Sequence, residues 1–365
     1  MLKIAQIAPL YESVPPKLYG GTERIVHYLT EALISQGHEV TLFASGDSVS
    51  KGRLIANVEK GLRLNKDCVD PLAPHIVQMQ EVLERVSEFD VLHFHTDYLH
   101  FPFSNQLTLP CITTLHGRLD LPDLKSLYKK FPMQKLVSIS DYQRKPLPEG
   151  NYIATVYHGL PLDLHQAGKG EGGYLAFLGR ISPEKGVDNA IKIAIAAGVE
   201  LKIAAKIDKV DQLYFERKIK PLLRHPLVEY VGEINEGEKT AFLGNAKATL
   251  FPINWPEPFG LVMIESMACG TPVIAFRNGS VPEVIDEPIT GLIVRTVKEA
   301  VKAVSIIDQL PRREVRRKFE ERFTATRMAK DYTQLYSSLI RTEKMKEVKD
   351  SNVKTLPKRN LLKKI

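Results

Sequence analysis

The sequence predicts an α/β protein built from two domains, each with a parallel β-sheet. Apolar strand-like runs alternate with amphipathic helical stretches along most of the chain. The alternation occurs twice, on either side of a connector at residues 160–173 that is rich in Gly, His and charged residues. Such alternation is typical of βαβ units, whose crossovers make the sheet parallel. The length of 365 residues is sufficient for two domains with separate cores.

Composition and cysteine usage are those of an ordinary soluble protein. Hydrophobic residues make up 44% of the chain and charged residues 25%. The apolar run at residues 1–9 is too short for a signal peptide or a membrane span, so we interpret it as the first strand. Cys68, Cys111 and Cys269 are far apart, which argues against a disulfide framework and a structural zinc site. We therefore expect a cytoplasmic location.

The net charge of +7 is concentrated in a tail at residues 343–365, which holds eight Lys or Arg and three acidic residues. The tail has no sustained apolar face, and we expect it to be disordered. The near-neutral remainder gives no reason to expect a nucleic-acid partner. A weak peripheral contact of the tail with anionic membrane is an alternative.

The N-terminal part begins with an expected strand at 2–8, a helix at 23–36 and a strand at 38–44. Gly20 and Gly21 precede the helix, at the carboxyl end of the first strand, where open α/β sheets bind ligands. A simple tight turn would explain the two glycines equally well. The sequence lacks a G-x-G-x-x-G fingerprint here, which disfavours a dinucleotide cofactor.

Further strands are expected before the connector. Period-two spacing places His93 and His95 on one face of a strand, which raises a metal site as an alternative, but no third and fourth ligand are evident nearby. Ser140 or Asp141 is expected to cap a helix. The expected strands are 90–97, 110–117, 136–144 and 153–159. The segment 136–144 is expected to run from a strand into that helix.

The C-terminal part begins with a strand at 174–178 and a helix at 187–197. Arg180 and Lys185 lie in the loop between them. Arginine binds phosphate through two parallel hydrogen bonds and lysine supplies a mobile charge, so both are candidates for a phosphate site. Two unrelated solvated cations are the alternative. The remaining expected strands are 201–205, 228–231, 248–252, 273–276 and 289–294, and the remaining helices 238–246, 261–268, 298–308, 314–324 and 328–339.

The helix at 261–268 is bracketed by two carboxylates, Glu257 and Glu265. Gly260 opens this helix, and the free backbone N–H groups of Leu261 and Val262 attract an anion through unsatisfied donors and the helix dipole. An anion site between two acids suits a sugar nucleotide. The diphosphate would bind the helix end, with one carboxylate near the sugar and the other near the ribose.

The segment Glu257-Pro-Phe-Gly-Leu-Val-Met-Ile-Glu265 resembles the E-x7-E signature of retaining glycosyltransferases with the GT-B fold, of the family 4 type (glycosyl transferases group 1). Gly270–Ala275 and Gly279–Ile285 are similar to the pattern of the same family. The resemblance implies two Rossmann-like domains facing across a cleft. It places an acceptor domain at 1–164, a donor domain at 165–325 and a helix at 326–342 that crosses back to the first domain.

The resemblance also implies a function. We expect retaining transfer of a hexose-type sugar from a nucleotide diphosphate sugar, most often UDP in this family, to an acceptor hydroxyl. We expect no cofactor and, since the sequence has no D-x-D pair, no metal. Glu257 and His116 are the expected catalytic residues, both near the sugar, and Glu265 would bind the ribose. The expected donor-binding set is Gly20, Gly21, Arg180, Lys185, Phe259, Gly260, Leu261, Val262 and Glu265.

Alternatives stay open at this point. They are another GT-B enzyme, such as a nucleotide-sugar epimerase or a phosphorylase, and a non-catalytic sugar-nucleotide-binding or membrane-scaffold protein. The sequence does not name the acceptor, whose contacts we expect from loops at 10–19, 45–70 and 118–132.

Overall fold

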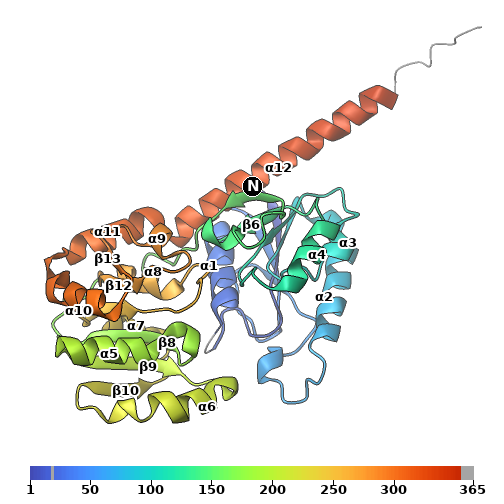
Figure 1. Ribbon diagram of the computed structural model, residues 1–365. Coiled ribbons are helices and arrows are strands. Elements are labelled where there is room, and N and C mark those ends of the chain that lie inside the picture. The colour runs from blue at the N-terminus through green and yellow to red at the C-terminus, as the bar shows by residue number, and fades with distance from the viewer. Residues whose placement is uncertain (18–19, 355–365) are drawn as a thin grey trace, which may run out of the picture.

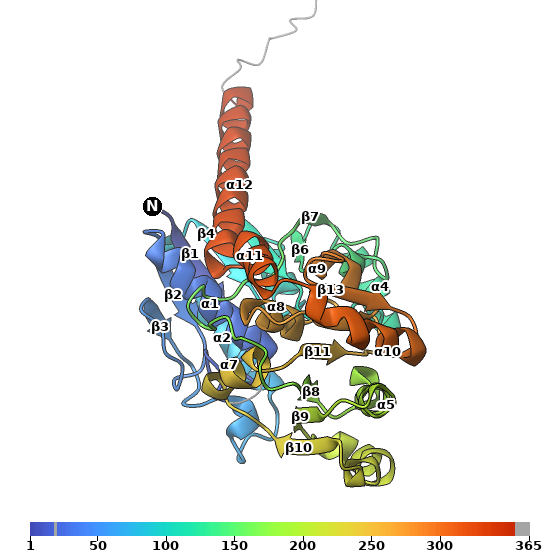
Figure 2. The same cartoon turned by 90° about the vertical axis from the view of Figure 1, so that its left-hand side faces the viewer.

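The computed structural model describes residues 1–17 and 20–354, with side chains up to Met345. Within these residues the chain forms two α/β domains that lie side by side, each built around one parallel sheet (Figures 1 and 2). The predicted fold class is therefore confirmed.

The N-terminal sheet has seven strands in the order β3-β2-β1-β4-β5-β6-β7. β1, β2 and β4 are buried along almost their whole length, as expected of parallel strands that carry helices on both faces. The strands are β1 (Lys3–Ile7), β2 (Glu39–Phe43), β3 (Arg53–Ile55), β4 (Val91–Phe94), β5 (Cys111–Thr114), β6 (Leu136–Ser138) and β7 (Tyr152–Thr155). The helices of this domain are α1 (Gly21–Ser35), α2 (Leu72–Glu84), α3 (Phe101–Ser104) and α4 (Pro122–Lys130).

Several features of this domain differ from the sequence-based expectation, since β3, which lies in the expected loop at 45–70, and the helices α2 and α3 were not predicted. The helix expected after residue 140 is only a short 3-10 turn at Tyr142–Arg144. Of the two expected caps, Ser140 Oγ accepts from the Gln143 amide at 3.0 Å and Asp141 makes no side-chain cap, but Pro146 prevents the turn from continuing as a helix. The segment 118–132, expected as a loop, contains α4.

The C-terminal sheet has six strands in the order β10-β9-β8-β11-β12-β13. Its strands are β8 (Leu175–Arg180), β9 (Leu201–Lys206), β10 (Val228–Gly232), β11 (Ala248–Phe251), β12 (Val273–Phe276) and β13 (Gly291–Val294). Its helices are α5 (Val187–Ala197), α6 (Gln212–Tyr214), α7 (Glu236–Gly244), α8 (Leu261–Ala268), α9 (Val281–Val284), α10 (Val297–Ile306) and α11 (Arg312–Arg322). α5, α8 and β12 have the predicted bounds. α7 begins two residues before its predicted start, because Asn235 and Glu238 form a reciprocal capping box.

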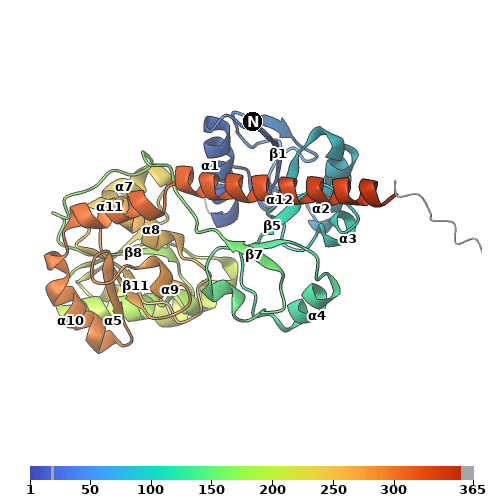
Figure 3. The same ribbon diagram turned by 90° about the horizontal axis from the view of Figure 1, so that it is seen from above.

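The chain crosses between the domains twice, and the two crossings lie side by side. The first is the connection between β7 and β8, which contains the predicted boundary at residue 164. The second leads into α12 (Ala325–Lys354), which lies across the N-terminal domain (Figure 3). The amide of Leu160 donates to Phe323 O at 2.9 Å, and the amide of Ala325 donates to Leu160 O at 2.7 Å. A Cβ on Gly159 would lie 2.2 Å from Thr324 O, so this close pairing requires glycine.

One apolar cluster runs through both domains and joins them. It includes Ile25 and Leu29 of α1, Met263 of α8, and Tyr332 and Tyr336 of α12. α12 packs on α1, which confirms that the C-terminal helix crosses back to the N-terminal domain. The cluster holds the amino-terminal end of α8 against the N-terminal domain, and this contact forms one wall of the site described below.

α12 continues through Lys354, so the expected disorder is wrong for residues 343–354. This stretch is rich in good helix formers and contains no glycine or proline. The rest of the predicted tail, 355–365, lies outside the described residues. Among the helices that the structure describes, none combines the length and the apolar character needed to cross a membrane.

Candidate active site

A cavity of about 710 Å³ lies between the two sheets and is lined by both domains. Its walls come from segments that directly follow strands: 95–99 after β4, 116–117 after β5 and 178–180 at the end of β8. The carboxyl ends of both parallel sheets therefore face the same space, which is where open α/β sheets bind ligands. All the residues predicted from the sequence to contact the donor or to act in catalysis line this cavity.

The amino-terminal ends of two helices, one from each domain, meet in the cavity. Gly20 and Gly21 begin α1, and the Cβ position of Gly21 lies 3.7 Å from Leu261 Cδ1 at the start of α8. Gly260 has φ +82°, and a Cβ there would lie 2.8 Å from Met263 Cε. Glycine is therefore required for the turn that opens α8. Two helix ends aimed at one space present free N–H groups and two positive dipole ends, an arrangement that binds a polyvalent anion.

Arg180, the last residue of β8, reaches the cavity with three carboxylates around it. Its guanidinium nitrogens lie 3.7 Å from Glu184, 3.5 Å from Asp208 and 3.5 Å from Asp211. Burial raises the pKa of Asp211, and Arg180 offsets part of that rise. These contacts are long for ion pairs, so the guanidinium is available to an incoming anion.

Lys185 is held by the first of the two signature glutamates. Its Nζ donates to Oε2 of Glu257 at 2.5 Å, and the indole N–H of Trp255 donates to the same oxygen at 2.8 Å. The ammonium also lies 5.3 Å from the centre of the Trp255 ring. Two donors on Oε2 fix the carboxylate and direct it so that Oε1 remains available to a hydroxyl.

Glu265, the second glutamate, is buried inside α8 and paired with a cation from α7. Lys239 Nζ donates to Glu265 Oε1 at 2.7 Å and to Glu236 Oε2 at 3.1 Å. Burial is the largest influence on the pKa of Glu265 and would raise it, but the charge and hydrogen bond of Lys239, together with His165 and Arg24, lower it below its usual value. Arg24 of α1 pairs with Glu236, so this network also joins the two domains.

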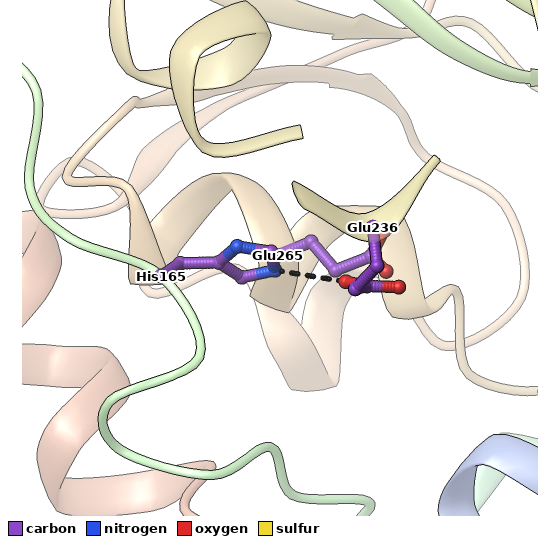
Figure 4. A group of neighbouring side chains, drawn as sticks. All are labelled: His165, Glu236 and Glu265. Atoms are coloured by element: carbon purple, nitrogen blue, oxygen red, sulfur yellow. Dashed lines mark ion pairs between the residues drawn. The ribbon is translucent and has the colours of Figure 1, made fainter. Parts of the chain in front are cut away.

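The same network contains the one group of side chains in the described residues whose geometry could suit a metal ion. His165, Glu236 and Glu265 each offer a ligand atom, and these atoms lie within 4.8 Å of one another (Figure 4). The His165 ring points toward the two carboxylates, with Nε2 at 3.4 Å from Glu236 Oε1. Lys239 and Arg24 already supply positive charge to both carboxylates. The donor set therefore fits an ion-pair network better than a cation site.

His116 lies at the centre of a group of buried imidazoles on the N-terminal wall. Its Nε2 is 2.8 Å from Nδ1 of His95, and its ring stacks on His158 with centroids 5.3 Å apart. His93 and His95 lie on one face as predicted, with ring centroids 4.0 Å apart. Both nitrogens of each of these two rings contact protein groups, which argues against the metal alternative.

Burial keeps these histidines neutral. It lowers the pKa of His116 to about 3 and the pKa values of His93, His95 and His158 well below the usual value. Asp97 lies two residues after His95, in the segment that follows β4. It has φ +50°, and desolvation raises its pKa to about 6.

Sequence reasoning missed three residues of the site. Lys239 and Arg24 complete the Glu265 network, and Trp255 orients Glu257. The Asn235–Glu238 capping box marks the start of α7 and could have placed Lys239 on its first turns. No local signal links Arg24 to a carboxylate more than 200 residues away.

Comparison with known proteins gives matches over most of the chain. The family described as Glycosyltransferase Family 4 matches residues 19–163, and that described as Glycosyl transferases group 1 matches residues 165–325. Glycogen synthase of Mycobacterium tuberculosis is 25% identical over 332 residues, covering 76% of this chain and 79% of that protein.

Solved structures also match. AviGT4, a glycosyltransferase involved in avilamycin A biosynthesis, is 25% identical with a TM-score of 0.71, over 93% of this chain and 98% of that one. HepE of Anabaena, solved in complex with UDP and glucose, is 17% identical with a TM-score of 0.69, over 93% of this chain and 100% of that one. At that identity the likeness to HepE concerns the fold alone.

Proposed function

The chain belongs to the glycosyltransferases of the group 1 and family 4 type with GT-B architecture, and we propose that it transfers a hexose-type sugar from a nucleotide diphosphate sugar to an acceptor hydroxyl with retention of configuration. The observation that carries the donor proposal is the meeting of two helix amino-terminal ends, Arg180 and Lys185 around one cavity. Four sources of positive potential in one space suit a diphosphate.

The two glutamates give the donor its direction. Glu265 lies one turn into α8, beyond the anion-binding amides, and its carboxylate would accept from the ribose hydroxyls. Glu257 precedes the helix, and its fixed carboxylate would accept from a hydroxyl of the sugar. His116, on the opposite wall, would contact the sugar or the reacting hydroxyl.

Catalysis in this proposal comes mainly from stabilising the leaving group. As the bond between the anomeric carbon and the diphosphate oxygen breaks, negative charge grows on the diphosphate, where the helix amides and both cations lie. The acceptor hydroxyl attacks on the same face and its proton passes to the departing diphosphate oxygen. Positive side chains and amides supply the charge stabilisation that a metal gives in other transferases, so we propose that transfer needs no metal.

The nucleotide we propose first is UDP, the ligand of the structurally similar HepE. Isothermal titration calorimetry with UDP, GDP and ADP, in the presence and absence of EDTA, tests the proposal. We expect one of the three to bind, with UDP the tightest and EDTA without effect. If none of the three bound, the assignment of the cavity to a nucleotide diphosphate would be wrong. If binding required added Mg²⁺, only metal independence would be lost.

A further inference from the structure

A chain of buried hydrogen bonds runs from the cavity through the N-terminal sheet to α12. His116 Nε2 lies 2.8 Å from His95 Nδ1, and His95 Nε2 lies 2.7 Å from Gln6 Oε1. The amide nitrogen of Gln6 then donates to Tyr336 Oη at 3.2 Å. Gln6 and Tyr336 are fully buried, so water cannot replace any of these partners.

The chemistry of the partners fixes the proton on each ring. A carboxamide oxygen only accepts, so His95 donates to Gln6 from Nε2. A neutral imidazole carries one N–H, so His95 Nδ1 is an acceptor, and His116 must donate to it from Nε2. The remaining nitrogen of His116, Nδ1, is then an acceptor with a free lone pair. It is buried and has no hydrogen-bond partner among the described residues.

At the far end of the chain the Gln6 amide meets α12. Tyr336 Oη accepts from Gln6 and lies 2.7 Å from His93 Nδ1, to which it donates. His93 in turn donates from Nε2 to Thr114 Oγ1 at 2.7 Å. With the Gln6 oxygen facing His95, as it does in the structure, each of these groups has a partner of the right kind. The helix that crosses back from the C-terminal domain thus contributes to the state of a ring in the cavity.

We propose that Gln6 and His95 are positioning residues that hold His116 in the Nε2–H tautomer, so that Nδ1 accepts a hydrogen bond from a hydroxyl of the bound sugar or acceptor. The role in transfer rests on the proposed function, whereas the tautomer is a property of the free protein. In the opposite tautomer Nδ1 would carry a proton, and the same hydroxyl would meet a donor in place of an acceptor.

The direct test is the imidazole ¹⁵N–¹H correlation spectrum of the free, histidine-labelled full-length protein at pH 7.5, with His116 assigned by His116→Gln. We expect a protonated Nε2 and an unprotonated Nδ1 for His116, and the same pattern for His95. A protonated Nδ1 on His116 would overturn the proposal whether or not the protein transfers a sugar.

A matched pair of variants tests the chain. Gln6→Met removes the acceptor for His95 and should allow the proton of His116 to move to Nδ1. Thr113→Val is the control. Thr113 is as buried as Gln6, and its Oγ1 lies 2.7 Å from Nε2 of His100, a histidine that does not belong to the chain of hydrogen bonds. We expect Gln6→Met to lower kcat by up to about 100-fold with unchanged KM for the nucleotide sugar. Thr113→Val should change neither kcat nor the signals of His116 and His95, and should shift only those of His100.

The variants separate positioning from folding. If Gln6→Met left the His116 tautomer unchanged, or if Thr113→Val shifted it to the same extent, Gln6 would not be a positioning residue. If the tautomer shifted in Gln6→Met without a change in kcat, the chain would exist but would not serve the reaction. A wild-type protein without turnover would contradict the proposed function and leave the spectroscopic result standing.

Discussion

The ammonium of Lys239 donates to Oε1 of Glu265 over 2.7 Å, and beside the cavity Glu265 is buried and Lys239 is mostly shielded from solvent. Glu236 shares the same ammonium and pairs with Arg24 of the other domain. The carboxylate that we assign to the ribose is therefore held in place before any nucleotide binds.

Lys239→Met should lower the free energy of unfolding by about 3–5 kcal/mol, because it leaves the Glu265 carboxylate buried without its cation. The pKa of Glu265 is depressed in the folded protein, so the stability it contributes is present above about pH 4.3, the unfolded value, and is lost as the pH falls further. In Lys239→Met the pKa of Glu265 should rise. Urea denaturation at pH 7.5 measures the loss.

The double variant Lys239→Met/Glu265→Gln is the control for this prediction. Neutralising both partners removes the uncompensated charge, so the double variant should be more stable than Lys239→Met alone. If the loss of unfolding free energy in the double variant equalled the sum of the losses in the two single variants, the pair would not be coupled.

Arg180→Ala should weaken binding of the nucleotide diphosphate by about 1.5–3 kcal/mol, since a hydrogen bond to a charged group is lost. Glu184 and Asp211 would then face the diphosphate without the cation that the structure places beside them, which adds to the loss, whereas Asp208 would keep its ion pair with Lys206 at 3.0 Å. Lys192→Ala is a suitable control, because Lys192 pairs with Asp188 on α5 and does not line the cavity. Calorimetry that gave equal affinity for Arg180→Ala and wild type would remove Arg180 from the phosphate site.

Acid should destabilise the protein through its buried histidines. Burial lowers the pKa values of His100 and His116 to about 3, whereas an unfolded histidine titrates near 6.5. The unfolded chain therefore binds protons that the folded chain does not, so stability is full above pH 6.5 and falls below it. Each such histidine should cost about 1.4 kcal/mol per pH unit below that value. Urea denaturation from pH 7.5 to 5 measures the slope of the unfolding free energy against pH. His100→Gln should reduce this slope by the contribution of one proton, about 1.4 kcal/mol per pH unit. A slope that is flat across this range would contradict the neutral state of these rings.

The loop-to-helix pairing at the domain junction predicts a strong effect of a small substitution. A Cβ at Gly159 would lie 2.2 Å from Thr324 O, so Gly159→Ala must separate the two crossings between the domains. We expect a loss of unfolding free energy of more than about 1 kcal/mol. Gly117→Ala is the matched control for stability, because a Cβ there meets nothing within 4 Å. Equal stability of the two variants, measured by thermal unfolding, would mean that the junction can open without cost.

The parts of the fold that the sequence predicted well are those with strong local signals. α8 has a glycine at its start and Gly270 and Pro272 after its end, and its predicted bounds are those observed. α2 was missed because its buried face carries His75 and Gln78 among the apolar residues, which hides the helical period.

The site shows the same division between local and long-range information. Gly260 and the two glutamates are recognisable because they lie in one segment of nine residues. The partners that orient the glutamates come from elsewhere in the fold. Only the tertiary structure shows that Lys239 reaches Glu265 from a different helix, or that His116 is connected to Tyr336.

Hydrolysis of the donor sugar by wild type and Glu257→Gln tests the central claim most directly. The substrate is the sugar-linked form of whichever nucleotide diphosphate binds, and release of free nucleotide diphosphate is measured. We predict slow release by the wild type and release reduced at least tenfold in Glu257→Gln, a loss of about 1.4 kcal/mol or more of transition-state stabilisation. The affinity for the free nucleotide should be nearly equal, because the sugar is the only part of the donor that we assign to Glu257 and a glutamine oxygen can still accept from Lys185. Equal release by both proteins, or a loss of nucleotide affinity in Glu257→Gln as large as that in Glu265→Gln, would contradict the assignment of Glu257 to the reacting sugar.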